Sequence, residues 1–216
     1  MLKMNCSYLK SFLFLIACFF TISIAGAQDF TAKIDSSRNV YKEAFLNDEH
    51  SPLSADDVKR LTFYAPDSAY RSIAKVKFIY DDQPIIIPTY SGKEKKYLRY
   101  AELNLTIKGK PIKLTLFKSI SLAADPQYKD YLFLPFTDPT NDDDTYGGGR
   151  YLDLKKSDIR GDELEVDFNM AYNPYCAYSA GYNCPIPPPE NAINIPVRAG
   201  EKKFAGTYKK EKRASK

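Results

Sequence analysis

The chain has 216 residues, of which 44% are hydrophobic and 27% are charged, and its formal net charge is +4. These values are typical of a globular protein with one hydrophobic core, and they exclude an intrinsically disordered chain. The only histidine, His50, lies in a predicted loop and has no second histidine with which to share a metal ion. The sequence therefore predicts neither a metal centre nor a cofactor.

The first 27 residues have the layout of a secretory signal peptide. Lys3 and Lys10 precede an apolar run over residues 12–25, and the small residues of an AGA sequence end at Ala27. We predict cleavage after Ala27, export across the inner membrane and a periplasmic protein without a transmembrane helix. The alternative is a lipid-anchored envelope protein, because the LIAC sequence ending at Cys18 resembles the lipobox of bacterial lipoproteins.

The basic residues are concentrated at the C-terminus. Residues 201–216 carry a net charge of +5, which leaves residues 28–200 near −3. We predict a single β-rich domain over residues 28–200, followed by a solvated, disordered tail, with contact between the tail and an anionic envelope surface as the alternative. Nucleic acid is not a predicted partner, because the exported domain has no basic excess.

Two helices are predicted before the first strand. Over residues 31–46, apolar side chains recur at intervals of three and four, which indicates an amphipathic helix. The apolar residues of this pattern are Ile34, Val40, Tyr41, Ala44 and Phe45. A short helix is predicted over residues 54–60, because the Ser54 hydroxyl can cap it.

From residue 61 onward the pattern changes to that of β-strands, with branched and aromatic residues in short segments bounded by Pro and Asp. The clearest feature is a hairpin in which residues 101–107 and 112–116 alternate apolar and polar side chains around a turn at Gly109. The other predicted strands are residues 61–65, 71–80, 85–88, 131–136, 163–168 and 193–197.

This order of elements predicts a mainly β fold, at the margin of α+β. Seven or eight short strands after one helical segment favour a single antiparallel β-sandwich or partly closed barrel with the helix packed on it. A parallel α/β sheet is disfavoured, because no helix-length pattern separates the strands.

Several motifs, in order along the chain, resemble a known family. They are PTYSG at 88–92, YLFLPF at 131–136, TYGGGR at 145–150, DFN at 167–169, AYNP at 171–174, Cys176, CP at 184–185 and PPPEN at 187–191. From about Tyr41 to Glu201 the chain resembles the bacterial family labelled domain of unknown function 1684. The resemblance implies one domain and a bacterial source, but no activity. Some relatives look cytosolic, so export is predicted from the first 27 residues and not from the family.

The TYGGGR motif is the first candidate ligand-binding segment. It consists of Thr145, Tyr146, Gly147, Gly148, Gly149 and Arg150. Three glycines let successive backbone N–H groups converge on an anion, and Arg150 can hold a carboxylate or phosphate bidentately. The alternative is a tight turn or bulge that ends in a strand, with Arg150 paired to Asp153, Asp167 or another acid. The motif lacks the Lys-Ser/Thr ending of a phosphate loop, so nucleotide binding is not predicted.

The second candidate segment contains Asp167, Asn169, Tyr172 and Asn173. Asp167 and Asn169 share one face of a predicted strand, and the turn before Pro174 can return the other two side chains onto that face. Together they suit a polar ligand near Arg150, or an acid/base role for Asp167 if its pKa is raised. A buried network that holds the strand to the following loop is the alternative.

Cys176 and Cys184 are the only cysteines after residue 27, and an oxidising compartment favours a disulfide between them. Such a short loop gives a stabilisation of about 2–3 kcal/mol. Upstream, Asp138 and residues 141–144 form an acidic cluster, but its spacing does not match an EF-hand, so calcium is not predicted.

The leading functional hypothesis is a non-catalytic cell-envelope protein. It binds a small anionic or polar ligand, or an envelope partner, through the two candidate segments. One alternative is a hydrolase in which Asp167 is the base, while Arg150 and the glycine-turn amides stabilise negative charge. The other is a purely structural domain in which both segments only fasten loops.

Overall fold

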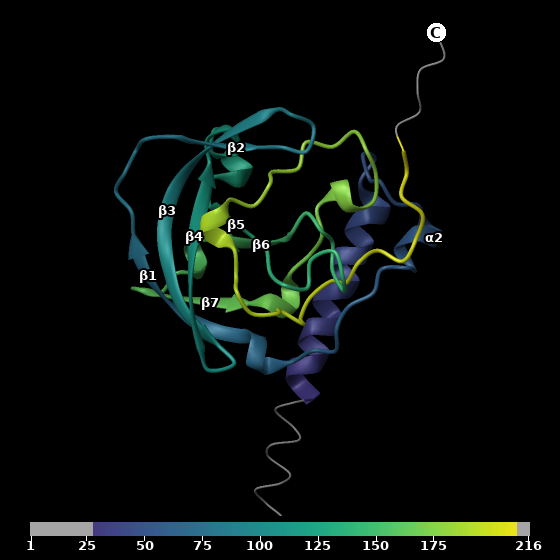
Figure 1. Ribbon diagram of the computed structural model, residues 1–216, viewed down its shortest axis with the longest axis horizontal. Helices are drawn as coiled ribbons and strands as arrows, with labels where there is room; N and C mark the ends of the chain where they lie inside the picture. The colour runs from purple at the N-terminus through teal and green to yellow at the C-terminus, as the bar shows by residue number, and fades with distance from the viewer. Residues whose placement is uncertain (1–27, 211–216) are drawn as a thin grey trace, which may run out of the picture.

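The computed structural model describes residues 28–210. The predicted signal peptide, Cys18 and the last six residues of the predicted tail lie outside this range. Figure 1 shows one curled sheet and a long N-terminal helix that lies on the side away from β3 and β4. No helix within the described range is long and apolar enough to span a membrane.

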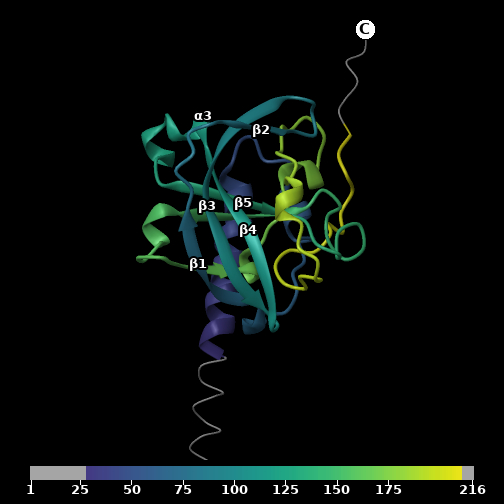
Figure 2. The same cartoon turned by 60° about the vertical axis from the view of Figure 1, so that its left-hand side comes forward.

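The sheet has seven strands. They are β1 (Arg71–Phe78), β2 (Ile85–Pro88), β3 (Glu94–Ile107), β4 (Lys110–Ser119), β5 (Tyr131–Phe136), β6 (Arg150–Lys155) and β7 (Glu163–Asp167). All pairs are antiparallel, in the order β6-β5-β4-β3-β1-β7, and β2 pairs with β3. β3 and β4 form a long, twisted hairpin (Figure 2). A bulge between Arg99 and Ala101 interrupts their register, which bends β3 and helps the sheet to curl. The predicted antiparallel, mainly β fold is confirmed as a curled half-barrel.

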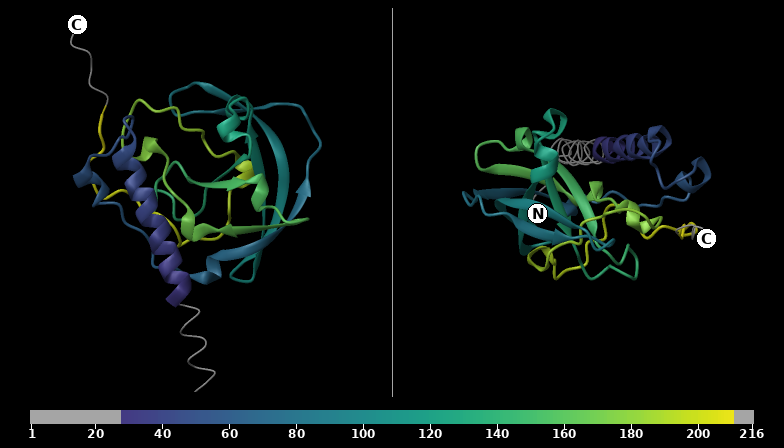
Figure 3. Two further views of the ribbon diagram at one scale, coloured as in Figure 1. Left: turned by 180° about the vertical axis from the view of Figure 1, so that it is seen from behind. Right: turned by 90° about the horizontal axis from the view of Figure 1, so that it is seen from above.

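Residues 28–47 are helical, which confirms the predicted N-terminal helix. Its inward stripe consists of Ile34, Arg38, Tyr41 and Phe45, at intervals of four, three and four. Val40 was expected on this stripe but is 64% exposed, because a step of one residue turns its side chain about 100° from Tyr41. Seen from behind, the helix lies alongside the segments that follow β7 (Figure 3).

The remaining helices are short. They are α2 (Ala55–Val58), α3 (Ile120–Ala123) and the 3₁₀ turns η1 (Ser68–Tyr70), η2 (Pro126–Tyr128), η3 (Lys156–Asp158), η4 (Phe168–Met170), η5 (Tyr175–Ala177) and η6 (Pro189–Asn191). The predicted cap of α2 is confirmed. Ser54 Oγ accepts from the Asp57 backbone N–H, and the Asp57 carboxylate accepts from the Ser54 N–H.

Two predicted strands are not strands in the structure. Residues 61–65 pair with residues 200–202 instead of joining the sheet, and they form a single bridge from Phe63 to Glu201. In residues 193–197, alternate side chains are buried, as in a strand, but they pack into the curl without a strand partner. In residues 193–197, burial of every second side chain therefore reflects packing into the core and not pairing with a strand. Strand β6 was expected only under the alternative in which the glycine turn ends in a strand, and the structure has that strand.

The two edges of the sheet are joined by a short bridge. After β7 the chain turns through η4, and Tyr172 then pairs with Tyr151 of β6 through backbone hydrogen bonds of 2.9 and 3.0 Å. Strands β4 and β5 also separate, and their register has the single pair Phe117 and Phe133. Beside that pair, the Asn191 side chain donates to the carbonyls of Thr115 in β4 and Pro135 in β5. The half-barrel is therefore held together by side chains and loops where the strands separate.

The sheet is buried on both faces at β5, where side chains alternate between two clusters. Leu132, Leu134 and Phe136 enter the main core inside the curl, and Phe133 enters an aromatic cluster on the other face with Tyr151. Burial on both faces explains why β5 is almost continuously apolar. A third cluster packs Phe45 of the N-terminal helix against residues 53–61 and 177–178.

The folded part of the chain extends past residue 200, where the disordered tail was predicted to begin. Glu201 is fully buried, and its backbone N–H donates to the Ala171 carbonyl at 2.8 Å. The Lys202 N–H donates to the Thr62 carbonyl at 2.9 Å. The net charge of residues 201–216 did not predict this, because the segment is mostly basic while its first residue, the acidic Glu201, is buried.

Candidate functional site

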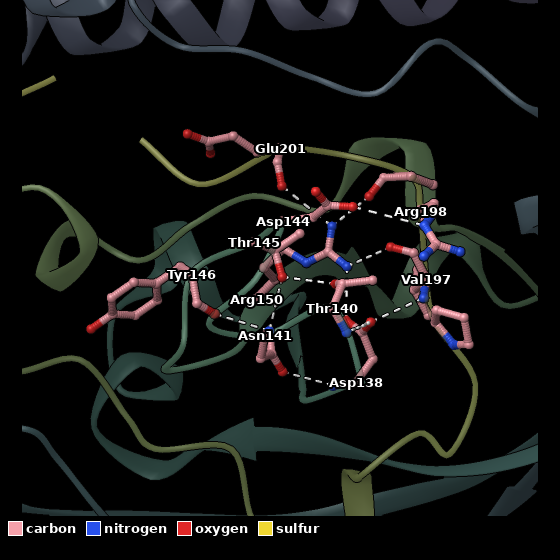
Figure 4. A network of polar contacts seen from close by, with 12 residues as sticks. Asp138, Thr140, Asn141, Asp144, Thr145, Tyr146, Arg150, Val197, Arg198 and Glu201 are labelled. Carbon is pink, nitrogen blue, oxygen red and sulfur yellow. Dashed lines mark hydrogen bonds and ion pairs between the residues drawn. The ribbon is translucent and has the colours of Figure 1, made fainter. Parts of the chain in front are cut away.

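Arg150 lies inside the protein and not on its surface. Its side chain and that of Asp138 are both 0% exposed, and Nη2 lies 2.9 Å from Asp138 Oδ2. Nη2 also donates to the Val197 carbonyl at 2.7 Å, while Nη1 donates to the carbonyls of Ala199 and Glu201 (Figure 4). The guanidinium is thus not available to an anion from solvent, and its acid partner is Asp138.

The glycine turn is closely packed around this pair. Gly149 has a φ of +85°, and a Cβ there would lie 2.6 Å from the Phe136 carbonyl oxygen. A Cβ on Gly148 would lie 2.2 Å from the Tyr90 hydroxyl. Thr145 is buried and its hydroxyl bonds that of Thr140 at 2.8 Å. TYGGGR is therefore a tight turn that leads into β6, and the positive φ and close packing at Gly149 require a glycine there.

The second candidate segment is also largely engaged. Asp167 Oδ1 accepts from the backbone N–H and the side-chain amide of Asn169, at 2.9 and 2.7 Å. Asn169 in turn bonds the backbone of Asp67 in both directions, and Asn173 donates to the Lys202 carbonyl. Burial raises the pKa of Asp167, although its bonds to Asn169 oppose this. Because Arg150 is closed off from water, the two segments do not face a common open pocket.

A hollow of about 740 Å³ lies between the N-terminal helix and β6. It is lined by the helix residues Ser37, Arg38, Tyr41, Ala44 and Phe45, by Phe63 and Lys95, by Tyr151, Leu152 and Asp153 of β6, by residues 169–172, by Pro174 and Tyr175, and by residues 182–185. Two of the predicted ligand-binding residues, Asn169 and Tyr172, are among them. The sheet edge and the helix are thus separated by a space that side chains do not fill.

Arg38 enters this hollow from the inward stripe of the helix. The residue is only 9% exposed, and its guanidinium lies 4.8 Å from the centre of the Phe63 ring. Nη1 is 3.7 Å from the largely exposed Asp35, and neither Nε nor Nη2 has a hydrogen-bond partner among the described residues. Burial lowers the pKa of Arg38, while the charges of Asp35 and Asp167 oppose this. Such unsatisfied buried donors are rare in folded proteins.

Lys95 of β3 adds a second cation to the wall of the hollow. Its side chain is half-buried, and burial lowers its pKa. No carboxylate within the described range lies within 4.0 Å of its ammonium group. The hollow therefore holds two cations, of which Arg38 has only the exposed Asp35 near it, at 3.7 Å, and Lys95 has no close acid among the described residues.

Asp153 of β6 is an acidic group in the same hollow. Its Oδ1 accepts hydrogen bonds from the Tyr131 hydroxyl at 2.8 Å and from the Tyr172 hydroxyl at 2.7 Å. The residue is exposed and lines the hollow, and the nearby protein atoms raise the pKa of its carboxyl group by desolvation. Its two phenol donors oppose that rise because they stabilise the carboxylate.

A second carboxyl group, Glu201, lies fully buried behind the helix. It accepts from the hydroxyls of Tyr41 and Tyr178, at 2.9 and 2.7 Å, and from the Asn173 backbone N–H. Desolvation raises the pKa of Glu201 to about 7. The carboxyl group thereby joins the helix to the loop after β7, although no cation within the described residues forms an ion pair with it.

The predicted disulfide between Cys176 and Cys184 is present, with a Cα–Cα distance of 6.1 Å. Cys184 lies in the wall of the hollow. The described part of the chain contains no cluster of three potential metal ligands from His, Cys, Asp and Glu.

Arg38, Lys95 and Asp153 were not predicted as site residues. Arg38 did carry a signal, because a charged residue four positions after Ile34 and three before Tyr41 falls on the apolar stripe of the helix. Lys95 sits in a run of lysines, and Asp153 in a segment not predicted to be a strand. The sequence pattern around Lys95 and Asp153 is the same as that around ordinary exposed charged residues, so it did not mark either as a site residue.

Comparisons with known proteins give a family without an assigned activity. A family model described as "Protein of unknown function (DUF1684)" matches residues 56–202. No curated protein matches the chain. The solution NMR structure of an uncharacterised protein from Haloarcula marismortui is 29% identical, with a TM-score of 0.64, and the match covers 84% of this chain and 98% of that chain. Since that organism is an archaeon, the bacterial source implied by the resemblance has only weak support.

We expect Arg150→Met to lower the free energy of unfolding by about 3–5 kcal/mol, because it leaves Asp138 charged, buried and without its ion-pair partner. Urea unfolding measures the change. Arg198→Met is the matched control. It removes a mostly exposed pair with Asp144, at 3.8 Å, and should change the stability by less than about 1 kcal/mol. Equal effects of the two substitutions would contradict the structural role of Arg150.

We expect the buried Glu201 to make the protein less stable as the pH rises. Its pKa in the folded protein is about 7, against an ordinary value of 4.5, so the folded state retains a proton that the unfolded state releases. The resulting stabilisation is complete below the unfolded pKa and is lost as the pH rises through about 7. Between pH values of about 4 and 8, wild type should lose about 3 kcal/mol relative to Glu201→Gln. Urea unfolding across this range tests this, with the exposed Glu190→Gln as a control that should run parallel to wild type.

Proposed function

We propose that this chain, which belongs to the DUF1684 family of proteins of unknown function, binds a small anionic ligand with an apolar body in the hollow between its N-terminal helix and β6. The observation that carries the proposal is the state of Arg38. Its guanidinium is nearly buried, yet two of its nitrogen atoms lack a hydrogen-bond partner within the described residues. A ligand carboxylate or phosphate supplies the acceptors that these donors need.

The remaining walls of the hollow fit the same class of ligand. Lys95 adds a second positive charge, and Tyr151, Tyr172 and Tyr175 supply aromatic surface. The volume of about 740 Å³ falls within the range of roughly 300–1,000 Å³ that is usual for small-molecule sites. An apolar wall with a few placed charges orients a ligand that has an anionic end and an apolar body.

This proposal keeps the class of ligand predicted from the sequence but moves its anion-binding group. Arg150 and the glycine turn form packed structure, whereas Asn169 and Tyr172 of the second segment line the hollow. Burial raises the pKa of Asp167, as an acid/base role would need, but the surroundings of this carboxyl group do not suit a hydrolase. Its carboxylate is bonded to Asn169, and Arg150 is buried away from it.

Substitution of Arg38 tests the anion site. Hexanoate and phenyl phosphate serve as probes of the two anion types, with binding measured by ligand-observed NMR. We expect Arg38→Gln to weaken binding of whichever probe binds by at least about tenfold, because the bidentate acceptor contact is lost.

Arg60→Gln makes the same change at an exposed position outside the hollow, and it should leave binding unchanged. Lys95→Gln and its neighbour Lys96→Gln form a second matched pair, in which only the first removes a charge from the hollow. Urea unfolding of each variant establishes that it folds. Absence of binding by both probes, or binding that Arg38→Gln does not weaken, would reject the proposal.

We further propose that the protein is exported and acts in the cell envelope. The layout of residues 1–27 and the disulfide between Cys176 and Cys184 support this, because disulfides persist mainly in oxidising compartments.

We expect a tagged full-length chain in a Gram-negative host to be cleaved and to fractionate with the periplasm. Its two mature thiols should react with maleimide only after reduction. The Cys18→Ser variant tests for a lipid anchor: if Cys18 carries one, this variant releases the protein from the membrane fraction, whereas the control variant Cys6→Ser does not. An uncleaved cytosolic protein with reactive thiols would be the contrary result.

A further inference from the structure

We propose that the ligand carries an ammonium group in addition to its anion, and that Asp153 binds this ammonium. The inference rests on the proposed function, because it concerns the same hollow, and it narrows the ligand to a small zwitterion. Asp153 is the acidic group of β6 in the wall, and Arg38 stands on the helix that forms the facing wall.

The state of Asp153 is the first step of the argument. Two phenols, from Tyr131 and Tyr172, both donate to Oδ1. No Lys, Arg or His within the described range lies within 4.0 Å of the carboxylate. The protein therefore positions this group firmly by one oxygen and leaves it without a counter-ion. A carboxylate that is fixed in place and has no counter-ion attracts a cation.

The surroundings of the carboxylate are suited to an ammonium group in particular. The Tyr131 and Tyr172 hydroxyls hold Asp153 by Oδ1, and Tyr172 also lines the hollow, so the approach to Oδ2 from the hollow is beside an aromatic side chain. A hydroxyl donor on the ligand would satisfy the free oxygen as well, but it would not balance the charge. Since an ammonium group does both, we expect the site to prefer it.

Arg38 and Asp153 together define the form of the ligand. Both line the hollow, and they do not form an ion pair with each other. Arg38 is nearly buried and has only the exposed Asp35 near it, and Asp153 has no cation within 4.0 Å among the described residues. A molecule with an anion at one end and an ammonium at the other compensates both groups at once.

A purely structural role for Asp153 makes a different prediction. If the carboxylate only accepts the two phenol hydrogen bonds, then Asp153→Asn, which keeps one oxygen acceptor, should leave ligand preference unchanged. If the charge binds an ammonium, the same substitution should remove the preference for amine-bearing ligands and leave binding of simple anions intact.

The experiment compares matched ligands on the mature protein purified from the expressing host. Hexanoate, octanoate and decanoate are titrated beside their ω-amino and ω-hydroxy counterparts, so that chain length samples the span between the two charges. For at least one length we expect the amino acid to bind about tenfold more tightly than the alkanoate. Asp153→Asn should reduce that ratio to about one, while alkanoate binding and its dependence on Arg38 stay as in wild type. Asp82→Asn, at an exposed loop position, should keep the preference.

The outcomes separate the two proposals. If alkanoates bind through Arg38 but the amine adds no affinity at any length, the ammonium site is wrong and the anion site stands. If ω-hydroxy and ω-amino ligands bind equally, Asp153 accepts an uncharged donor and the inference is also overturned. If no member of either series binds, the proposed function fails together with it. Urea unfolding of Asp153→Asn confirms that a lost preference is not a lost fold.

Discussion

The ion pair between Arg150 and Asp138 is the interaction on which the rest of the structure depends. Arg150 stands at the start of β6, and its other bonds go to the carbonyls of residues 197, 199 and 201. It thereby holds a segment without regular structure against the sheet. That segment ends in Glu201, whose carboxyl group binds Tyr41 of the helix and Asn173 after β7. Arg150 thus fixes the segment that carries Glu201, and Glu201 in turn bonds the N-terminal helix. The position of the helix, and with it the hollow, therefore depends on the buried charge of Arg150.

The protein buries two arginines, and it satisfies the hydrogen-bond donors of one far better than those of the other. The Arg150 guanidinium makes four hydrogen bonds, one of which is also its ion pair with the buried Asp138, and only its Nε lacks a partner. The Arg38 guanidinium makes no hydrogen bond within the described residues, and its nearest acid, Asp35, is mostly exposed. Burial therefore costs Arg38 hydration without full compensation. An interaction partner from outside the chain is the simplest way to restore the balance.

Much of the fold was predictable from the sequence, because local patterns reflect local physics. The amphipathic helix, the hairpin around Gly109 and the serine cap of α2 each follow from residues close together in the chain. The mistaken strand at 193–197 has the spacing of a strand but packs into the core without a strand partner, and spacing alone does not reveal whether a partner exists. The candidate site shows the same limit. Three glycines and an arginine attract attention, yet they are explained by Asp138, twelve residues upstream, and by a carbonyl of β5.

The hollow lies where the half-barrel stops being a sheet, and this position explains its chemistry. Tyr151 and Tyr172 form the bridge between the two edge strands and also stand in the wall. A continuous sheet would use regular strand pairing there, whereas a single bridge leaves Asp153, two residues further along β6, without a strand neighbour on that side. The helix spans the gap but meets it with Arg38, a side chain too polar to fill an apolar space. Incomplete closure of the barrel thus accounts for the volume and for an acid without a counter-ion, so the proposed binding site coincides with the feature that ends the sheet.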